Sequence, residues 1–558
     1  MTALVSHLRA QTRAPLAVAA LAGAVTALGQ APWGLWWLTL PALAAALVLI
    51  ATAPTTRAAF ARGWAAGAGA FLLAMVWIVE PFLIEPWLHG WLAPFAVILL
   101  PSGLALFWGA AAAFAAWAAR GTAARLWLLV PTLVAGEAVR GHVLTGFPWA
   151  MLGHVWIDTP VAQLAAWTGA LGLSLLTLTL AAALAQAGIL ARARPVAATV
   201  SVLAATVALA AAWGGGTARL AAPGPEPRDL RLRLVQPNAA QELKWHGDYA
   251  RRFFFRHLDL TAAAPADGRA PDLVIWSETA VPFFLERPGD GLAMAAEAAG
   301  DATLLLGIQR TQFSDEGKLQ YFNSLAVLDA DGAPVEVYDK HHLVPFGEYV
   351  PVFGRFADRP GLGWLSGFAS QVLLGYSAGP GPVLLDLGEA GRVLPLICYE
   401  AIFPRNLRGT DRPDWLVQVT NDAWFGDWIG PFQHLAQARL RAIEQGLPLA
   451  RAANTGVTAV IDARGQVVAY LGMGAAGTVD ADLPGALPPT AYARWGDLPW
   501  QAALALLLLL ATGLRLMRPR HAAHQRRPLT LPRRAVRRIY PVTTASWRDG
   551  CIQWSTFS

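Results

Sequence analysis

The first part of the chain is a series of apolar blocks separated by short polar segments. Each block is close to the roughly 20 residues that an α-helix needs to cross a bilayer. We expect seven spans in this part and an eighth near the C-terminus. The predicted spans lie at residues 14–30, 33–53, 61–80, 91–118, 124–141, 161–190, 196–214 and 500–517.

The pattern changes between residues 228 and 488. Short β-type runs alternate there with helical patterns, which is typical of an α/β domain with helices covering a sheet. The runs predict strands at 230–236, 272–276, 303–307, 324–328, 392–397 and 415–419, and helices at 247–263 and 433–445. Residues 329–332 (DADG) and 462–465 (DARG) predict hairpin turns.

These patterns predict four parts. Residues 1–216 form a seven-span membrane domain, 228–488 a catalytic α/β domain, 489–517 a C-terminal transmembrane helix and 518–558 a basic tail. Composition agrees, because 55% hydrophobic and only 14% charged residues are unusual for a soluble protein. The 24 Trp also suit a membrane protein, in which aromatic side chains gather at both bilayer interfaces.

Arginine placement predicts the orientation, because short cytoplasmic loops hold an excess of Lys and Arg. Pairs of arginines precede the first span and occupy alternate loops: Arg9 and Arg13, Arg57 and Arg62, Arg120 and Arg125, Arg192 and Arg194. Both termini are therefore expected in the cytoplasm and the α/β domain outside it. The basic tail could contact anionic lipid headgroups, with a disordered topology anchor as the simpler interpretation. No motif supports nucleic-acid binding.

Three apolar runs of the α/β domain end on a reactive side chain. Glu278, Lys340 and Cys398 end the runs 273–278, 335–340 and 393–398, and sites in such sheets collect at the carboxyl ends of strands. If the three converge, Cys398 is a nucleophile, Glu278 its general base, and Lys340 the cation that stabilises thiolate and oxyanion, helped by a backbone N–H near Tyr399. The alternatives are a core cysteine and an ordinary surface ion pair.

Other polar candidates are weaker. His341 and His342 are adjacent and point to opposite faces of an extended segment, so they make a poor metal pair. We find no zinc-type Cys/His spacing and no phosphate-cradling loop, and we expect no metal or cofactor. Glu348 is a candidate to position Lys340 or an incoming amine, with a structural hydrogen bond as the alternative. Cys551 receives no role, and a disulfide with Cys398 is not expected.

Two aromatic clusters are candidates for contact with lipid. Residues 354–370 hold Trp364, Leu365 and Phe368, which could dip into the outer leaflet and admit a lipid chain. A second cluster, which could act as a lid, contains Trp424, Phe425 and Trp428. Core packing is the competing interpretation for Trp424 and Phe425.

Several segments resemble the motifs of apolipoprotein N-acyltransferases, bacterial inner-membrane enzymes of the nitrilase superfamily. They are residues 276–282 (WSETAVP), 338–351 (YDKHHLVPFGEYVP), 397–404 (ICYEAIFP) and 420–426 (TNDAWFG), with 430–434 (GPFQH) and 451–456 (RAANTG) in agreement. The resemblance runs from the first span through the eighth. Trp428 departs from the pattern, where a small polar residue is expected, and the segment beyond about Arg520 matches nothing in the family.

The resemblance implies an αββα sandwich whose catalytic triad is Glu278, Lys340 and Cys398. It also implies supporting roles for Glu348, Tyr399 and Glu400. By this resemblance, Cys398 attacks a phospholipid acyl ester to form a thioester, which then acylates the α-amino group of the S-diacylglyceryl cysteine of an apolipoprotein. Two half-reactions through one covalent intermediate predict ping-pong kinetics.

The resemblance further implies a monomer in the bacterial inner membrane with a periplasmic catalytic domain. Two alternatives stay open. One is a membrane-tethered nitrilase-type amidase, for which eight spans would be excessive. The other is a transporter or receptor with a ligand-binding external domain. The small number of ionisable residues in the spans argues against it, with Glu137 as the main candidate for a functional charge within the membrane.

Overall fold

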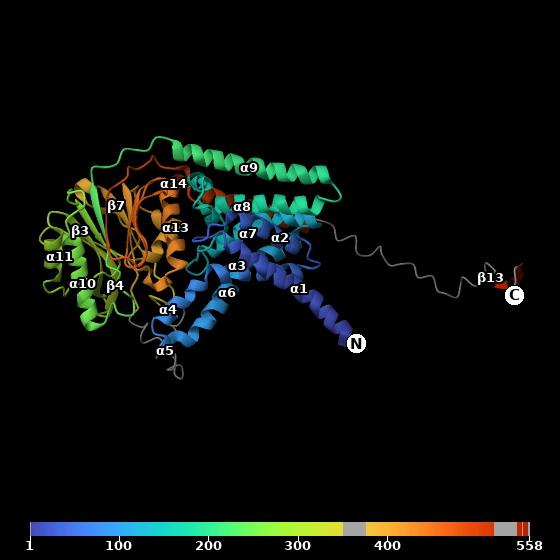
Figure 1. Cartoon of the computed structure of the whole chain (residues 1–558), viewed down its shortest axis with the longest axis horizontal. Helices are drawn as coiled ribbons and strands as arrows, with labels where there is room; N and C mark the ends of the chain where they lie inside the picture. Colours follow the sequence, from blue (N-terminus) through green and yellow to red (C-terminus); the bar gives the residue numbers. More distant parts are fainter. Residues whose placement is uncertain (1, 350–374, 518–543, 549–550, 556–558) are drawn as a thin grey trace. The chain divides into compact units, whose positions relative to one another are not determined.

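The computed structural model describes residues 2–349, 375–517, 544–548 and 551–555 (Figure 1). Residues 1–509 form one compact unit, and residues 510–558 form a second. The predicted lipid-contacting residues Trp364, Leu365 and Phe368 lie outside the described residues.

The N-terminal part of the first unit is a bundle of helices. Its long members are α1 (Thr2–Ala27), α2 (Trp36–Ala51), α3 (Thr56–Ala74), α6 (Ala93–Ala118), α7 (Thr122–Arg140), α8 (Ala165–Leu190) and α9 (Pro195–Ala221). The short elements η1 (Val76–Val79), α4 (Glu80–Leu83), α5 (Pro86–His89) and η2 (Gly90–Leu92) connect α3 to α6. Small buried residues such as Ala66 and Ala112 let these helices approach closely, as in membrane bundles.

Among the described residues, five helices are long and apolar enough to cross a membrane: Pro86–Ala118, Thr122–Arg140, Pro160–Leu190, Pro195–Ala221 and Leu498–Leu516. They correspond to five of the predicted spans. A sixth would be Thr56–Ala74 with Val76–Leu83, which is bent by 65°. The apolar helices at the first two predicted spans are shorter, Ala14–Ala27 and Trp36–Ala51, so eight crossings stay a prediction.

Two six-stranded sheets form the α/β domain. The first sheet has the order β12-β1-β2-β3-β4-β5 and the second β11-β10-β9-β8-β7-β6. The first comprises β1 (Arg231–Gln236), β2 (Leu273–Trp276), β3 (Thr303–Phe313), β4 (Leu319–Leu328), β5 (Pro334–Asp339) and β12 (Gly477–Asp482). The second comprises β6 (Leu385–Asp386), β7 (Arg392–Ile397), β8 (Trp415–Thr420), β9 (Leu449–Ala453), β10 (Thr458–Ile461) and β11 (Val467–Leu471).

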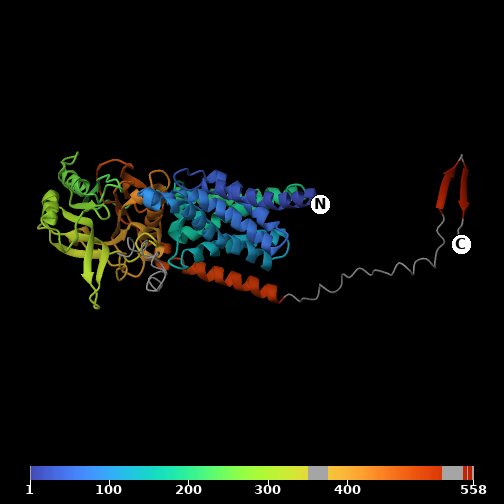
Figure 2. The same ribbon diagram turned by 90° about the horizontal axis from the view of Figure 1, so that it is seen from below.

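Side-chain alternation along the strands builds the layers. On β2, Leu273 and Ile275 face the core between the two sheets, whereas Val274 and Trp276 pack beneath α10 (Gly247–Ala262) and α11 (Gly291–Ala299). The strands of the second sheet likewise pack one face against the first sheet and the other against α13 (Gly430–Gln445). The domain is therefore an αββα sandwich, and the helices α1–α9 are grouped on the side of α13 (Figure 2).

The short elements η3 (Leu152–Trp156) and η4 (Pro160–Leu164) precede α8, while η6 (Gly388–Ala390), η7 (Cys398–Ile402), η8 (Pro404–Leu407) and η9 (Asp422–Phe425) follow strands of the second sheet. After the sandwich come α14 (Ala491–Trp495) and α15 (Leu498–Leu516). In the second unit, β13 (Thr544–Arg548) pairs antiparallel with β14 (Cys551–Ser555). No pattern in the basic tail predicts this hairpin.

Candidate active site

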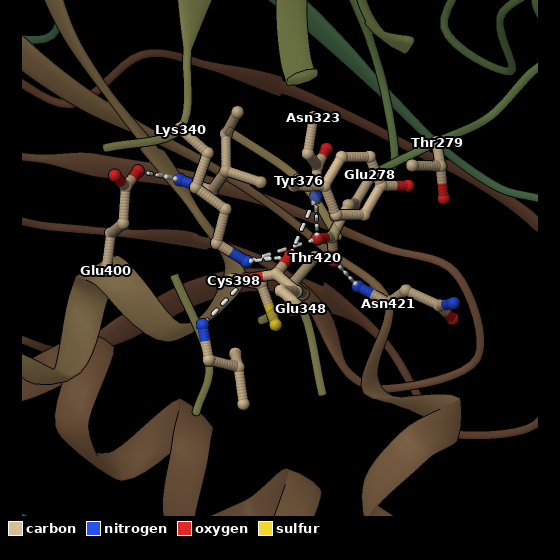
Figure 3. A network of polar contacts seen from close by, with 12 residues as sticks. Glu278, Thr279, Asn323, Lys340, Glu348, Tyr376, Cys398, Glu400, Thr420 and Asn421 are labelled. Atoms are coloured by element: carbon tan, nitrogen blue, oxygen red, sulfur yellow. Dashed lines mark hydrogen bonds and ion pairs between the residues drawn. The ribbon is translucent and has the colours of Figure 1, made fainter. Parts of the chain in front are cut away.

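The three predicted reactive side chains meet where the strands end. Glu278 follows β2, Lys340 follows β5 in the same sheet, and Cys398 follows β7 in the opposing sheet. The Lys340 Nζ lies 3.6 Å from the Glu278 Oε1, and the Cys398 thiol lies beside both (Figure 3). All three are buried, with exposed fractions of 6%, 1% and 5%. The site thus combines a thiol, a carboxylate and an ammonium group away from water.

Hydrogen bonds hold the Glu278 carboxylate at both oxygens. Its Oε1 accepts from the Asn323 amide at 2.7 Å, and its Oε2 accepts from the Asn421 backbone N–H at 2.7 Å. Behind it, β3 comes so close that a Cβ at Gly307 would lie 2.4 Å from the Ser277 carbonyl oxygen. Glycine at this position therefore lets the strand support the turn that carries Glu278.

Lys340 is held between two carboxylates. Its Nζ donates to the Glu348 Oε1 at 2.7 Å, and the Glu348 Oε2 accepts the Val344 backbone N–H at 2.8 Å. Burial lowers the pKa of Lys340, but the charges of Glu348 and Glu278 outweigh it and raise the pKa above its usual value. These carboxylates favour the charged form of Lys340, and the Lys340–Glu348 hydrogen bond is compatible with both interpretations of Glu348.

Cys398 has a φ of +51°, which is unusual for a residue with a side chain and costs about 1–3 kcal/mol. Its carbonyl oxygen lies 3.0 Å from the His434 Nε2 and accepts from the Gln418 amide at 3.2 Å. Burial, reinforced by the Glu278 charge, raises the pKa of the thiol, while Lys340 opposes the rise. These surroundings therefore favour the protonated thiol over the thiolate.

Glu400 joins the end of β5 to the nucleophile turn. Its fully buried carboxylate accepts backbone N–H groups from Ile397 at 2.8 Å, His341 at 2.9 Å and His342 at 3.1 Å. The Tyr338 hydroxyl also donates to it. Although burial raises the pKa of Glu400, these bonds and His341 lower it below its usual value. Glu400 thus fixes the position of Lys340 relative to Cys398 without touching either reacting group.

The remaining predicted residues occupy the side that faces the helices. The Tyr399 hydroxyl donates to the Gly146 carbonyl at 3.4 Å. Phe425 packs between Trp77 and Trp149, with ring centroids 5.0 and 5.6 Å away, so its contacts agree with the packing interpretation. Trp424 and Trp428 are 40% and 47% exposed and remain candidates for contact with lipid.

Sequence reasoning missed several residues that support the triad. Lys244 donates to the Glu278 carbonyl at 3.1 Å, and burial lowers the pKa of Lys244 to about 8 against the opposing charge of Glu278. Asn323 and Tyr376 lie beside Glu278 (Figure 3). Asn323 is a polar residue at the start of the apolar part of β4, and this position could have marked it as a site residue. No sequence pattern marked Tyr376. His434 stood in a motif but received no role.

The described residues contain no group of three or more His, Cys, Asp and Glu side chains that could hold a metal ion. His341 and His342 both have other partners. The Nδ1 of His341 lies 2.8 Å from Glu400, and the ring of His342 stacks on Phe403 with centroids 3.7 Å apart. Both histidines are occupied by structural contacts.

Residues 182–491 match the family model of the carbon–nitrogen hydrolases, so the sandwich and its site define a protein of that class. Residues 22–183 match the model of the apolipoprotein N-acyltransferase N-terminal domain. Apolipoprotein N-acyltransferases from Rhodopseudomonas palustris and Bradyrhizobium diazoefficiens are both 39% identical, over 88% of this chain and 94% of theirs. The enzyme from Caulobacter vibrioides is 39% identical over 88% and 93%. The chain belongs to the apolipoprotein N-acyltransferase family.

Solved structures also align with the sandwich. The CN-hydrolase superfamily protein XC1258 from Xanthomonas campestris is 21% identical and covers 52% of this chain and 98% of its own, with a TM-score of 0.33. An amidase from Nesterenkonia is 19% identical over 47% and 92%, with a TM-score of 0.31.

Proposed function

We propose that the protein transfers an acyl chain from a phospholipid, through a thioester on Cys398, to the α-amino group of the N-terminal S-diacylglyceryl cysteine of an apolipoprotein. Family membership supports the overall reaction. The observation that carries the chemistry is the Glu278–Lys340 pair, 3.6 Å apart, beside the buried Cys398 thiol. Such a set supplies a base, a cation and a nucleophile in one place.

In the first half-reaction, Glu278 takes the Cys398 proton while the sulfur attacks the ester carbonyl carbon of the phospholipid. The carbonyl oxygen becomes an oxyanion, and the Lys340 ammonium stabilises this charge in a site where water cannot screen it. When the ester C–O bond breaks, Glu278 returns the proton to the leaving alkoxide. The products are a Cys398 thioester and a lysophospholipid.

In the second half-reaction, the neutral α-amine of the apolipoprotein attacks the thioester carbonyl. Glu278 accepts a proton from the amine nitrogen, the C–S bond breaks, and the sulfur recovers the proton as a thiol. The product is an amide, so the step is an N-acylation. Because the thioester stores the activated acyl group, this sequence uses no metal or diffusible cofactor.

We extend the proposal to the placement of the chain. The parts are a membrane domain of seven spans (1–216), the catalytic domain (228–488), an eighth span (489–517) and a cytoplasmic tail (518–558). The catalytic domain faces the periplasm, both termini face the cytoplasm, and the protein is a monomer in the inner membrane. Arginines in alternate loops support this orientation. The exposed Trp424 and Trp428 are suited to contact the lipid substrates.

Acyl labelling tests the proposal. Purified protein incubated with a phospholipid labelled in its acyl chain should become labelled, and neutral hydroxylamine should release the label. Cys398→Ala should take up none. Cys551→Ala removes the other cysteine and is the matched control, which should label as the wild type does.

An unlabelled wild type, or label that persists in Cys398→Ala, would show the proposal to be wrong. A thioester that passes its acyl group only to water, and not to a diacylglyceryl-cysteine peptide, would favour the amidase alternative.

A further inference from the structure

Two adjacent residues at the start of α13 face in different directions. Gln433 contacts the membrane domain and His434 contacts the nucleophile turn, and both are buried, with exposed fractions of 4% and 0%. Neither has a role in the chemistry proposed above. Because the two residues are adjacent in α13, the helix backbone links the hydrogen bonds of Gln433 to the membrane helix with those of His434 to Cys398.

On the membrane side, Gln433 binds the point where a helix is broken. Its Nε2 donates to the carbonyl of Ala74, the last residue of α3, at 3.2 Å. Its Oε1 accepts from the indole N–H of Trp77, at 3.2 Å, and from that of Trp149, at 2.6 Å. The helix bends by 65° at this place, and a carbonyl at a helix end needs such a partner.

On the catalytic side, His434 binds the nucleophile turn. Its Nε2 lies 3.0 Å from the Cys398 carbonyl oxygen, and its Nδ1 lies 2.9 Å from the Asp422 Oδ1. Asp422 is in turn paired with the fully buried Arg451. Because Cys398 has a positive φ, its backbone keeps this shape only while its neighbours hold it.

Aromatic packing joins the two sides. The Trp77 and Trp149 rings are 4.8 Å apart, and Trp149 lies 5.7 Å from the His434 ring. Phe425 contacts Trp77, Trp149 and His434. Phe425 lies in η9, which begins directly after Asn421. The Asn421 backbone N–H donates to the Glu278 carboxylate. A shift of the helix bend would therefore reach both the nucleophile and its base.

We propose that Gln433 is a positioning residue. It fixes the position of the nucleophile turn relative to the bend in the membrane helix. It acts through His434, which holds the Cys398 carbonyl, and touches no reacting atom itself. The inference rests on the proposed function, because it concerns the rate at which Cys398 forms its thioester. A glutamine that only filled space would leave that rate unchanged when replaced by a residue of similar volume.

The test uses Gln433→Met, which keeps the volume and removes all three hydrogen bonds to the membrane domain. The matched control is Gln437→Met, one turn later on α13. Gln437 is equally buried, at 1% exposure, and its amide donates to the Gln433 carbonyl at 3.4 Å, with no bond to the membrane domain among the described residues. The full-length proteins are compared by single-turnover thioester formation over a range of phospholipid concentrations, and by Tm.

We expect Gln433→Met to slow thioester formation at saturating phospholipid at least tenfold, with a half-saturating concentration within twofold of the wild type. Gln437→Met should stay within threefold in both quantities. Should Gln433→Met fail to fold, Trp77→Phe and Trp149→Phe, which keep an aromatic ring of smaller size and remove one N–H each, should each slow the same step at least threefold.

Equal rates for Gln433→Met and Gln437→Met would overturn the inference, as would wild-type rates in both Trp→Phe variants. These outcomes differ from failure of the proposed function, in which the wild type itself forms no thioester.

Discussion

The surroundings of Cys398 disfavour its thiolate. Burial and the charges of Glu278 and Asp422 raise the pKa of its thiol, while Lys340 and a hydrogen bond with Thr420 lower it. The thiolate is the nucleophilic form, so the resting protein holds little of it at neutral pH. Attack then depends on proton transfer to Glu278 within the complex rather than on a standing thiolate. The two charged partners therefore have opposite effects on the free thiol.

Replacing Glu278 separates its charge from its role as a base. Glu278→Gln should slow acyl transfer by about 10²–10⁴-fold or more, because the general base is lost. The pKa of the Cys398 thiol should fall, because the nearby negative charge is gone. Alkylation of Cys398 by iodoacetamide at pH 8, measured in a Cys551→Ala background, should therefore become faster than in the parent. Lys340→Met should make it slower, and the reverse order would contradict these assignments.

Strands with regular apolar alternation were predictable. The six expected strands are present, and both predicted hairpin turns form, between β4 and β5 and between β10 and β11. Three strands were missed: β6, which has only two residues, and β9 and β12, in which polar residues interrupt the pattern. β9 carries Arg451, which is buried against Asp422 and Gln418. β12 pairs with β1, where Asp480 binds Arg233 at 2.8 Å. These charges are satisfied by residues far away in sequence.

The residues of the candidate site likewise divide into those that the sequence predicted and those that it did not. Glu278, Lys340 and Cys398 were found because each closes a strand. Three further supports were not, since Lys244, Asn323 and His434 come from a loop, a strand and a helix that local patterns do not bring together. A residue that acts through one hydrogen bond to a distant backbone group leaves no periodic signal in the sequence.

The contact between α13 and α8 should depend on pH through Glu444. This fully buried carboxylate accepts the Ala170 N–H at 3.2 Å and the Arg441 guanidinium at 2.8 Å. Burial raises the pKa of Glu444 from 4.5 to about 7, although Arg441 opposes the rise. Between these values the folded protein binds more protons than the unfolded chain. Stability contributed by this group is therefore present below pH 4.5 and lost as pH rises toward 7.

Glu444→Gln should remove that dependence. Relative to the wild type, the variant should gain up to about 3 kcal/mol between pH 4.5 and pH 8, or several degrees of Tm. Thermal unfolding across this pH range measures the difference. Glu297→Gln, at an exposed position on α11, is the control and should show none. A wild-type pH profile in Glu444→Gln would contradict the role of this carboxylate.

At the scale of the whole molecule, the N-terminal helical bundle packs directly against the α/β domain. Side chains Ala436, Leu440 and Ile443 of α13 belong to the same apolar cluster as α2, α7 and α8. The helix that supports the nucleophile turn is thus packed on the membrane bundle. We therefore expect the catalytic domain to function only together with these helices and on one side of the membrane.

Reporter fusions test that side. Alkaline phosphatase, which needs the disulfides that form outside the cytoplasm, should be active when fused after Gly465 and inactive when fused after Arg520. Green fluorescent protein at the same two positions should give the opposite pattern. Activity after Arg520 with none after Gly465 would invert the predicted orientation.

The burial of Cys398 also bears on redox chemistry. Oxidation of a cysteine to sulfenic acid, and its capture in mixed disulfides, both proceed through an exposed thiolate. A thiol that is 5% exposed and kept protonated offers little of that species. If the catalytic domain faces the oxidising periplasm, as proposed above, the burial of Cys398 should slow its oxidation and help to keep the thiol reduced.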